Sequence, residues 1–208
     1  MVFKSIFHNE TSENTFLVFD EETKNGIIID PGCKMEKIDN LIAENGVNVK
    51  YILLTHCHYD HIKGVEKLRE ITGAELCVTE ECAGNIKNPN VNLSGAWLDY
   101  KIVHENPEIT LNENEVFNFE GIEVKTIKTP GHTNCSTCFI FGNDLFSGDT
   151  LFLQTTGRWD LPTGDEDTLR KSIKEKLYTL DDDINVYPGH GKKTSIGYEK
   201  NFNFLVRG

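Results

Sequence analysis

The stretch Thr55-His56-Cys57-His58-Tyr59-Asp60-His61 decides how this sequence is interpreted. It places three imidazoles and one carboxylate within the six residues from His56 to His61. Imidazole nitrogen and carboxylate oxygen are ligands for zinc and for divalent ions of similar hardness. The apolar run Val49–Leu54, just before it, is predicted to be a buried strand. We therefore predict a metal site at the end of a rigid element, where active sites of α/β proteins usually lie.

Three further residues with metal-binding side chains each follow a glycine at the end of a predicted strand. They occur in Pro130-Gly131-His132, Ser147-Gly148-Asp149 and Pro188-Gly189-His190. Glycine suits a crowded rim because its backbone can come close to a neighbour without a side chain in between. The four motifs supply enough candidate ligands for two metal ions that share a carboxylate: His56, His58, Asp60, His61, His132, Asp149 and His190.

Composition and charge narrow the class of protein. The chain has 208 residues and a net charge of −12, with 26% charged and 38% hydrophobic residues, which is ordinary for one globular domain. An acidic protein is not attracted to nucleic acid or to an anionic membrane. No apolar run approaches the roughly 20 residues that span a bilayer, and the first residues do not resemble a signal peptide. We therefore expect a cytoplasmic location.

Cysteines and the remaining histidines lie outside this ligand pattern. In a cytosolic chain, the six cysteines are expected to be free thiols. Cys135 and Cys138 have the spacing of half a zinc knuckle, but no matching second pair exists, so a structural zinc site is not predicted. Cys138 is expected to lie in the core, and Cys57 is expected to point away from the ligands. Whether Cys135 contacts the site is left open. His8 and His104 are expected to be surface or structural residues.

The order of predicted elements is neither alternating βα nor all-β. It fits two halves, each a sheet with helices outside. The expected helices are 35–45, one after His61, 168–180 and 195–201, and 85–108 is expected to be mostly loop. The expected strands are 2–7, 15–19, 26–29, 49–54, 75–78, 115–119, 122–127, 137–141, 144–146 and 184–187.

The motifs resemble those of a known family. Thr55–His61 is similar to the H-x-H-x-D-H signature of the metallo-β-lactamase superfamily, and Thr129–Thr133, Ser147–Phe152 and Tyr187–Gly191 are similar to its later motifs, in the right order. This resemblance implies an α/β (α+β) fold, the four-layer αββα sandwich, with metals at the sheet edges. It also implies a first metal bound by His56, His58 and His132, a second bound by Asp60, His61 and His190, and Asp149 bridging both.

Within the superfamily the chain looks most like the short bacterial form of glyoxalase II. The similar segments are Gly157–Asp165, Gly191–Glu199 and Asn201–Leu205. Long glyoxalase II carries a C-terminal helical domain that holds glutathione. Because this chain stops at Gly208, we expect a single domain over residues 1–208 without it, which leaves glutathione specificity open.

The resemblance implies a thioesterase acting on S-lactoylglutathione-like hydroxyacyl thioesters. Two divalent ions, expected to be zinc with iron or manganese as alternatives, would hold a bridging hydroxide that Asp60 orients. Arg158 is a candidate contact for a substrate anion, with a salt bridge to Asp160 or Asp165 as the alternative. Trp159 either forms a pocket wall or packs. The acyl group, thiol carrier, metal identity and oligomeric state are left open.

Other functions on the same fold fit the motifs less well than hydrolysis does. Persulfide dioxygenases share the first motif but use one iron, held by the equivalents of His56, His132 and Asp149. Their last motif lacks the Gly-His-Gly form of residues 189–191, which favours the hydrolase. His61 and Asp149, where true β-lactamases have a cysteine, also favour hydrolase branches. A phosphodiesterase or nuclease is disfavoured by the acidic charge, and a non-catalytic metal-binding module leaves the full bridging set unexplained.

Overall fold

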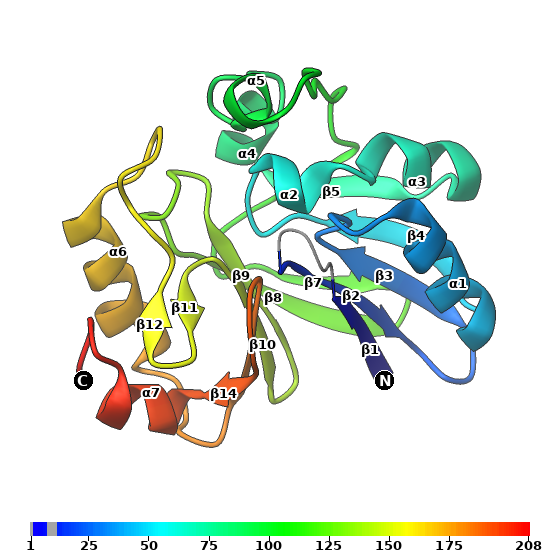
Figure 1. Cartoon of the computed structure of the whole chain (residues 1–208). Coiled ribbons are helices and arrows are strands. Elements are labelled where there is room, and N and C mark those ends of the chain that lie inside the picture. Colours follow the sequence, from blue (N-terminus) through cyan, green and yellow to red (C-terminus); the bar gives the residue numbers. More distant parts are fainter. Residues whose placement is uncertain (1, 8–11) are drawn as a thin grey trace.

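The computed structural model describes residues 2–7 and 12–208, which form two mixed six-stranded sheets (Figure 1). The strands of the first sheet follow one another in chain order. They are β1 (Val2–Phe7), β2 (Asn14–Phe19), β3 (Asn25–Ile29), β4 (Asn48–Leu53), β5 (Glu75–Thr79) and β6 (Ile109–Leu111). The first three strands pair antiparallel, and β3 to β6 pair parallel. The parallel crossovers contain α1 (Met35–Asn45) and α3 (Val65–Thr72).

The second sheet is built from the later part of the chain. Its order is β14 (Thr194–Ser195), β13 (Asn185–Pro188), β10 (Asp144–Gly148), β9 (Thr137–Phe141), β8 (Ile122–Lys128) and β7 (Val116–Phe119). A small hairpin, β11 (Leu151–Phe152) and β12 (Thr155–Thr156), follows β10. On the outer side lie α6 (Glu166–Ser172), the π-helical segment η1 (Ile173–Leu177) and α7 (Ile196–Phe202), at the far left of Figure 1.

Side-chain alternation along the strands produces four layers. In β2, Phe16 and Val18 join the apolar cluster between the sheets, whereas Leu17 and Phe19 join the cluster under α1 and α3. In β10, Phe146 likewise points between the sheets, and the neighbouring Leu145 packs toward the outer helices of the second sheet. Period-two alternation of this kind makes each sheet apolar on both faces. The predicted αββα sandwich is therefore confirmed.

The sheet geometry brings the candidate ligands to one edge. β4 ends shortly before His56, and β8, β10 and β13 end shortly before His132, Asp149 and His190. Because β10 and β13 are parallel, and β8 and β10 both pair antiparallel with β9, these three strands end at the same side of their sheet. Ligands that are far apart in sequence thus converge.

Some helices differ from the prediction for identifiable reasons. The helix expected after His61 is split into α2 (Tyr59–Ile62) and α3, because Gly64 approaches Pro31 closely. The Gly64 N–H donates to the Pro31 carbonyl at 2.8 Å, and a Cβ at position 64 would lie 2.7 Å from that oxygen. The helix expected over 168–180 begins as α6 and widens into η1, where the Tyr178 N–H donates to the Ile173 carbonyl, five residues back.

The region expected to be mostly loop contains short helices. α4 (Glu80–Asn85) ends at the first residue of this region and α5 (Ser94–Trp97) lies within it. Strands β6, β11, β12 and β14, of two or three residues each, are too short to show a periodic pattern. His8 lies outside the described residues. Among the described residues, no helix has the length and apolar character needed to cross a membrane.

Candidate metal centre

The structure gathers six of the seven candidate ligands into two adjacent sets, with Asp149 between them. One ligand atom from each of His56, His58 and His132 lies within 4.8 Å of the others, and the same holds for Asp60, His61 and His190. Asp149 lies between the two sets, as shown by its carboxylate distances. Its Oδ2 is 3.5 Å from His132 Nε2 and 3.4 Å from His190 Nε2, and its Oδ1 is 3.5 Å from His61 Nε2.

The donor atoms fit metal ions. Tetrahedral zinc with nitrogen ligands at about 2.0–2.1 Å separates those ligands by about 3.3–3.4 Å. The neighbouring donor atoms here are separated by 2.9 Å, between His58 Nδ1 and His132 Nε2, to 4.0 Å, between Asp60 Oδ2 and His61 Nε2. The buried atoms His56 Nε2, His58 Nε2 and Asp149 Oδ1 have no hydrogen-bond partner among the described residues. Buried polar atoms are costly without a partner, and a bound cation would satisfy two of them, His56 Nε2 and Asp149 Oδ1.

Hydrogen bonds at the second ring nitrogen orient three of the imidazoles. His132 Nδ1–H donates to the Arg158 carbonyl at 2.6 Å. His61 Nδ1 lies 3.0 Å from Asp30 Oδ2, and His56 Nδ1 lies 3.1 Å from the Thr55 hydroxyl. Because carbonyl and carboxylate oxygens only accept, the Nδ1 atoms of His132 and His61 carry the proton, which leaves each Nε2 lone pair for a metal.

Asp30 is a candidate positioning residue that the sequence motifs did not identify. Its buried carboxylate accepts from the Thr55 N–H at 2.8 Å and from the Thr55 hydroxyl at 2.6 Å, in addition to His61. It therefore supports both sets of ligands. In the sequence, Asp30-Pro31-Gly32 has the composition of a turn and carries no ligand motif. Its position directly after β3, at the same sheet edge as the His/Asp run, was the clue.

Asn14 is a second residue that the sequence did not reveal. Its side-chain amide donates to the carbonyls of Pro188 and Gly191, both at 3.0 Å, and so brackets His190. Its backbone N–H donates to the Gly189 carbonyl at 2.7 Å, and Glu13 forms a β-bridge with His190. The edge of the first sheet thus holds a loop of the second sheet.

Two glycines approach candidate ligands closely, and one of them, Gly189, is a strand-end glycine for which this role was predicted. A Cβ at Gly189 would lie 2.4 Å from Asp149 Oδ1 and 2.8 Å from His61. At Gly32, a residue without such a prediction, a Cβ would lie 1.6 Å from the Asp60 carbonyl oxygen. Any side chain at either position would displace a candidate ligand.

Burial and neighbouring charges set the protonation of the site. Burial lowers the pKa of His56 well below its usual value and that of His58 to about 3, so both rings are neutral and able to bind a metal. Burial alone would raise the pKa of Asp60, but His61 and His190 outweigh it and lower that pKa. Burial opposes protonation of His61 as well, but Asp149 and Asp60 raise its pKa.

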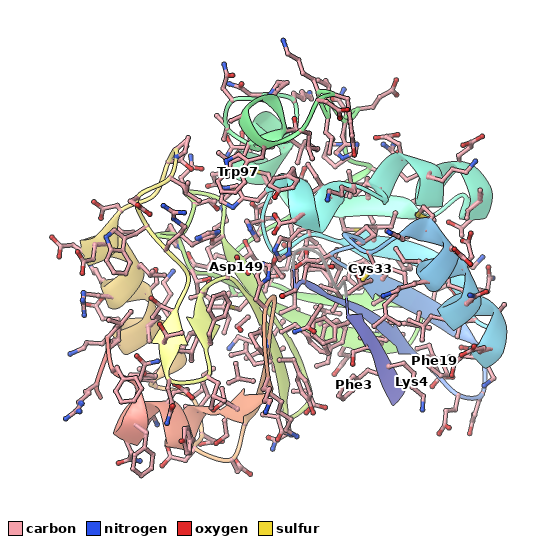
Figure 2. All side chains as sticks on the ribbon, viewed as in Figure 1. Phe3, Lys4, Phe19, Cys33, Trp97 and Asp149 are labelled. Atoms are coloured by element: carbon pink, nitrogen blue, oxygen red, sulfur yellow. The ribbon has the colours of Figure 1, made fainter. Side chains whose placement is uncertain are left out.

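A cavity of about 260 Å³ opens over the cluster. Its floor contains His58, Asp60, His132, Asp149 and His190, and its walls are mostly apolar. The wall residues are Tyr59, Leu93, Trp97, Phe152, Gly157, Arg158 and Leu161. In Figure 2, Asp149 lies centrally, between the two halves of the molecule. A small substrate could therefore reach the ligand atoms from one side.

Four other residues considered in the sequence analysis form a salt bridge, a hydrogen bond or core contacts. Arg158 lines the cavity, and its guanidinium pairs with Asp160 at 2.7 and 2.8 Å, one of the two salt-bridge partners considered. Trp159 packs against the apolar cluster of the second half, and Cys138 belongs to that cluster. His104 is buried and lies 3.0 Å from the Ile62 carbonyl, a structural role.

The cysteines lie away from the cavity. All six are buried free thiols. Cys57 and Cys135 join the apolar cluster under the helices of the first half, and neither lines the cavity in the part of the chain that the structure describes. Cys57 thus points away from the ligands on either side of it, as predicted.

Replacing Asp30 with asparagine is expected to weaken metal binding by about 10- to 100-fold, as changes behind metal ligands commonly do. Asparagine keeps the size and tolerates the positive φ of 49° at this position, but its amide nitrogen is only a donor, so one of the two oxygens that accept from Thr55 and His61 is lost. Competition with a chelator measures the affinity. Asp20→Asn, which changes a turn carboxylate that accepts from the Glu22 and Thr23 N–H groups, is the control. Equal affinity in Asp30→Asn and wild type would contradict the orienting role.

Sequence comparison finds relatives over most of the chain. The family model described as the Metallo-beta-lactamase superfamily matches residues 8–190. The "Probable metallo-hydrolase M6_Spy0554" of Streptococcus pyogenes is 34% identical over 208 residues, covering 97% of this chain and 88% of the relative. The "Hydroxyacylglutathione hydrolase GloC" of Haemophilus influenzae is 34% identical over 206 residues, covering 92% of this chain and 91% of the relative.

Solved structures match the whole fold. BLEG-1, described as a B3 metallo-beta-lactamase, has a TM-score of 0.93 and 29% identity, with 100% of both chains covered. ETHE1 from Myxococcus xanthus has a TM-score of 0.82 and 29% identity, covering 99% of this chain and 84% of that one. TTHA1623, solved in a di-iron-bound form, has a TM-score of 0.83 and 29% identity, covering 98% of this chain and 100% of that one.

Proposed function

Because this chain belongs to the metallo-β-lactamase superfamily and is a metal-dependent hydrolase of that fold, we propose that it hydrolyses small hydroxyacyl thioesters of the S-lactoylglutathione kind. The similarity to a hydroxyacylglutathione hydrolase supports this substrate class. The observation that carries the proposal is the position of Asp149, whose carboxylate lies within 3.5 Å of both histidine sets. A carboxylate shared in this way is the arrangement that a two-metal hydrolase needs.

Each residue of the centre has a proposed role. His56, His58 and His132 would hold one divalent ion, Asp60, His61 and His190 the other, and Asp149 would contact both. When bound, such a pair of ions lowers the pKa of a water molecule and polarises a carbonyl group. The structural similarity to a di-iron form and the all-nitrogen-and-oxygen donor set suit zinc, iron or manganese.

The chain's own groups would direct the reaction. Asp60 is kept ionised by its histidine neighbours and lies in the cavity floor, so it can accept a hydrogen bond from the attacking water and orient it. The leaving thiol has a pKa of about 8.5 and does not require a strong general acid. Arg158 can contact a substrate carboxylate by exchanging it for Asp160, since the pair is solvent-exposed.

The second candidate is a mononuclear-iron persulfide dioxygenase. The contact between His132 and Asp149, at 3.5 Å, is compatible with an iron held by these two residues and His56. The hydrolase is favoured because His190 is also in place, 3.4 Å from Asp60 and 3.4 Å from Asp149. A mononuclear site gives those contacts no function.

Purified protein is expected to bind two divalent ions per chain and to hydrolyse S-lactoylglutathione or a related hydroxyacyl thioester. Chelation should abolish the activity, and added zinc, iron or manganese should restore it. Metal analysis, thioester hydrolysis, oxygen uptake on glutathione persulfide and hydrolysis of a β-lactam are measured on the same preparation. One iron per chain with oxygen uptake would select the dioxygenase, and preferred turnover of the β-lactam would reject thioester hydrolysis as the main activity.

A further inference from the structure

One wall of the cavity is aromatic and is partly exposed to solvent. Tyr59, Leu93 and Trp97 form this wall, which we call the aromatic wall. The rings of Tyr59 and Trp97 are stacked with centroids 6.3 Å apart and an angle of 25° between planes. Trp97 is 60% exposed, although large aromatic side chains are usually more buried. Exposed apolar surface beside a pocket commonly marks a binding site.

The aromatic wall stands at the mouth of the site. Figure 2 shows Trp97 below the coil of α5, on the side toward Asp149. Tyr59 directly precedes Asp60 in α2, so the wall begins beside a candidate ligand. A ligand that fills the cavity therefore contacts Trp97 as well as the centre.

Buried hydrogen bonds hold the aromatic wall in place. Asn92 is fully buried, its carbonyl accepts from the Tyr59 N–H at 2.8 Å, and its side chain donates to the Ile102 carbonyl at 2.9 Å. Leu93 has a positive φ of 66°, an unfavourable conformation for a branched residue that surrounding contacts must maintain. A wall fixed before binding loses little conformational freedom when a ligand arrives.

The cavity offers little positive charge for an anionic carrier. Among the described residues that line it, Arg158 is the only lysine or arginine, and its guanidinium already pairs with Asp160 through two hydrogen bonds. Lys63 lies 4.9 Å from the Tyr59 ring centroid and does not line the cavity. The two carboxylates of a glutathione arm would compete for one side chain.

We propose that the aromatic wall binds an apolar, uncharged thiol arm of the substrate, so that the carrier is selected by stacking on Trp97 rather than by its carboxylates. This inference rests on the proposed thioesterase function. A hydroxyacyl group as short as lactoyl is confined to the cavity floor, and the longer thiol arm must leave along a wall. The aromatic wall provides a stacked, partly exposed apolar face for that arm.

The test compares three lactoyl thioesters that differ only in the thiol. The thiols are glutathione, the neutral N-acetylcysteamine and the neutral aromatic 2-phenylethanethiol. We expect kcat/KM for the phenylethanethiol ester to exceed that for N-acetylcysteamine by about tenfold, a stacking-sized effect, and to equal or exceed that for glutathione. Trp97→Ala should remove this preference by raising KM for the phenylethanethiol ester about tenfold, with a much smaller rise in KM for the N-acetylcysteamine ester, and the variant should keep its full metal content.

Tyr100→Ala is the matched control, because Tyr100 is an exposed aromatic on the same segment that does not line the cavity. Calorimetric binding of the non-hydrolysable thioether analogue of the phenylethanethiol ester separates binding from turnover. A tenfold preference for the glutathione ester, or an equal loss for all three esters in Trp97→Ala, would overturn the inference and leave the thioesterase intact. Thioether binding that depends on Trp97, without hydrolysis of any ester, would refute the thioesterase and keep the wall as a binding site.

Discussion

Replacing Asp149 with alanine is expected to lower thioester hydrolysis at least a thousandfold and to remove most of the bound metal. Asp149 contacts histidines of both sets, at 3.4 to 3.5 Å, so its loss removes a ligand from each. It also removes the negative charge that faces these closely spaced imidazoles. Metal ions contribute several kcal/mol to transition-state stabilisation, and about 4 kcal/mol corresponds to a thousandfold in rate.

Metal content per chain and kcat/KM are measured together on the Asp149→Ala protein. Asp39→Ala is the control, because Asp39 is an exposed carboxylate on α1 that does not line the cavity. Circular dichroism establishes that both variants are folded. Wild-type turnover by a folded Asp149→Ala protein without metal would reject the metal-dependent mechanism.

Replacing His190 with alanine is expected to remove one of two metals and to reduce hydrolysis about a hundredfold or more. His190 contributes to the set with Asp60 and His61, whereas the set of His56, His58 and His132 stays intact. The remaining ion can still polarise a carbonyl, so a small residual activity is expected. This variant distinguishes the two candidate functions, since a mononuclear enzyme would retain its iron and its oxygen uptake.

Phe204→Ala provides the control for His190→Ala, because it changes an exposed ring near the end of the chain. The measurements are metal analysis, thioester hydrolysis and oxygen uptake. A His190→Ala protein that keeps full thioester activity with one ion per chain would show that the second set is not needed for hydrolysis.

Local patterns predicted much of this fold. The helix over residues 35–45 agrees in both bounds, because Ile38 and Leu41 recur at helical spacing and Gly46 ends the helix with a φ of 62°. The strand over 137–141 also agrees, and most other strands differ by one or two residues at an end. Apolar periodicity and turn residues are local signals, so they can be recognised without knowing the partner of each segment.

Contacts between distant segments were not predicted. Asn14 holds carbonyls that lie 174 and 177 residues away along the chain, and a carbonyl has no signature in sequence. Asp30 reaches Thr55 and His61 because β3 and β4 pair in parallel and end at the same edge of the sheet. The short helix α5, which places Trp97 at the cavity, begins at Ser94, whose N–H donates to the buried side chain of Asn92, and it does not depend on a hydrophobic repeat.

The sequence by itself determined which residue types are available for metal binding and their order along strand ends, because ligand chemistry and glycine spacing are properties of short segments. Only the tertiary structure decided how those residues combine. The packing of two sheets places the Asp149 carboxylate between two histidine sets and supports His61 with Asp30. It also sets an exposed Trp97 beside that centre. Such distances arise from strand pairing and sheet packing between segments far apart in the chain, and no local pattern records them.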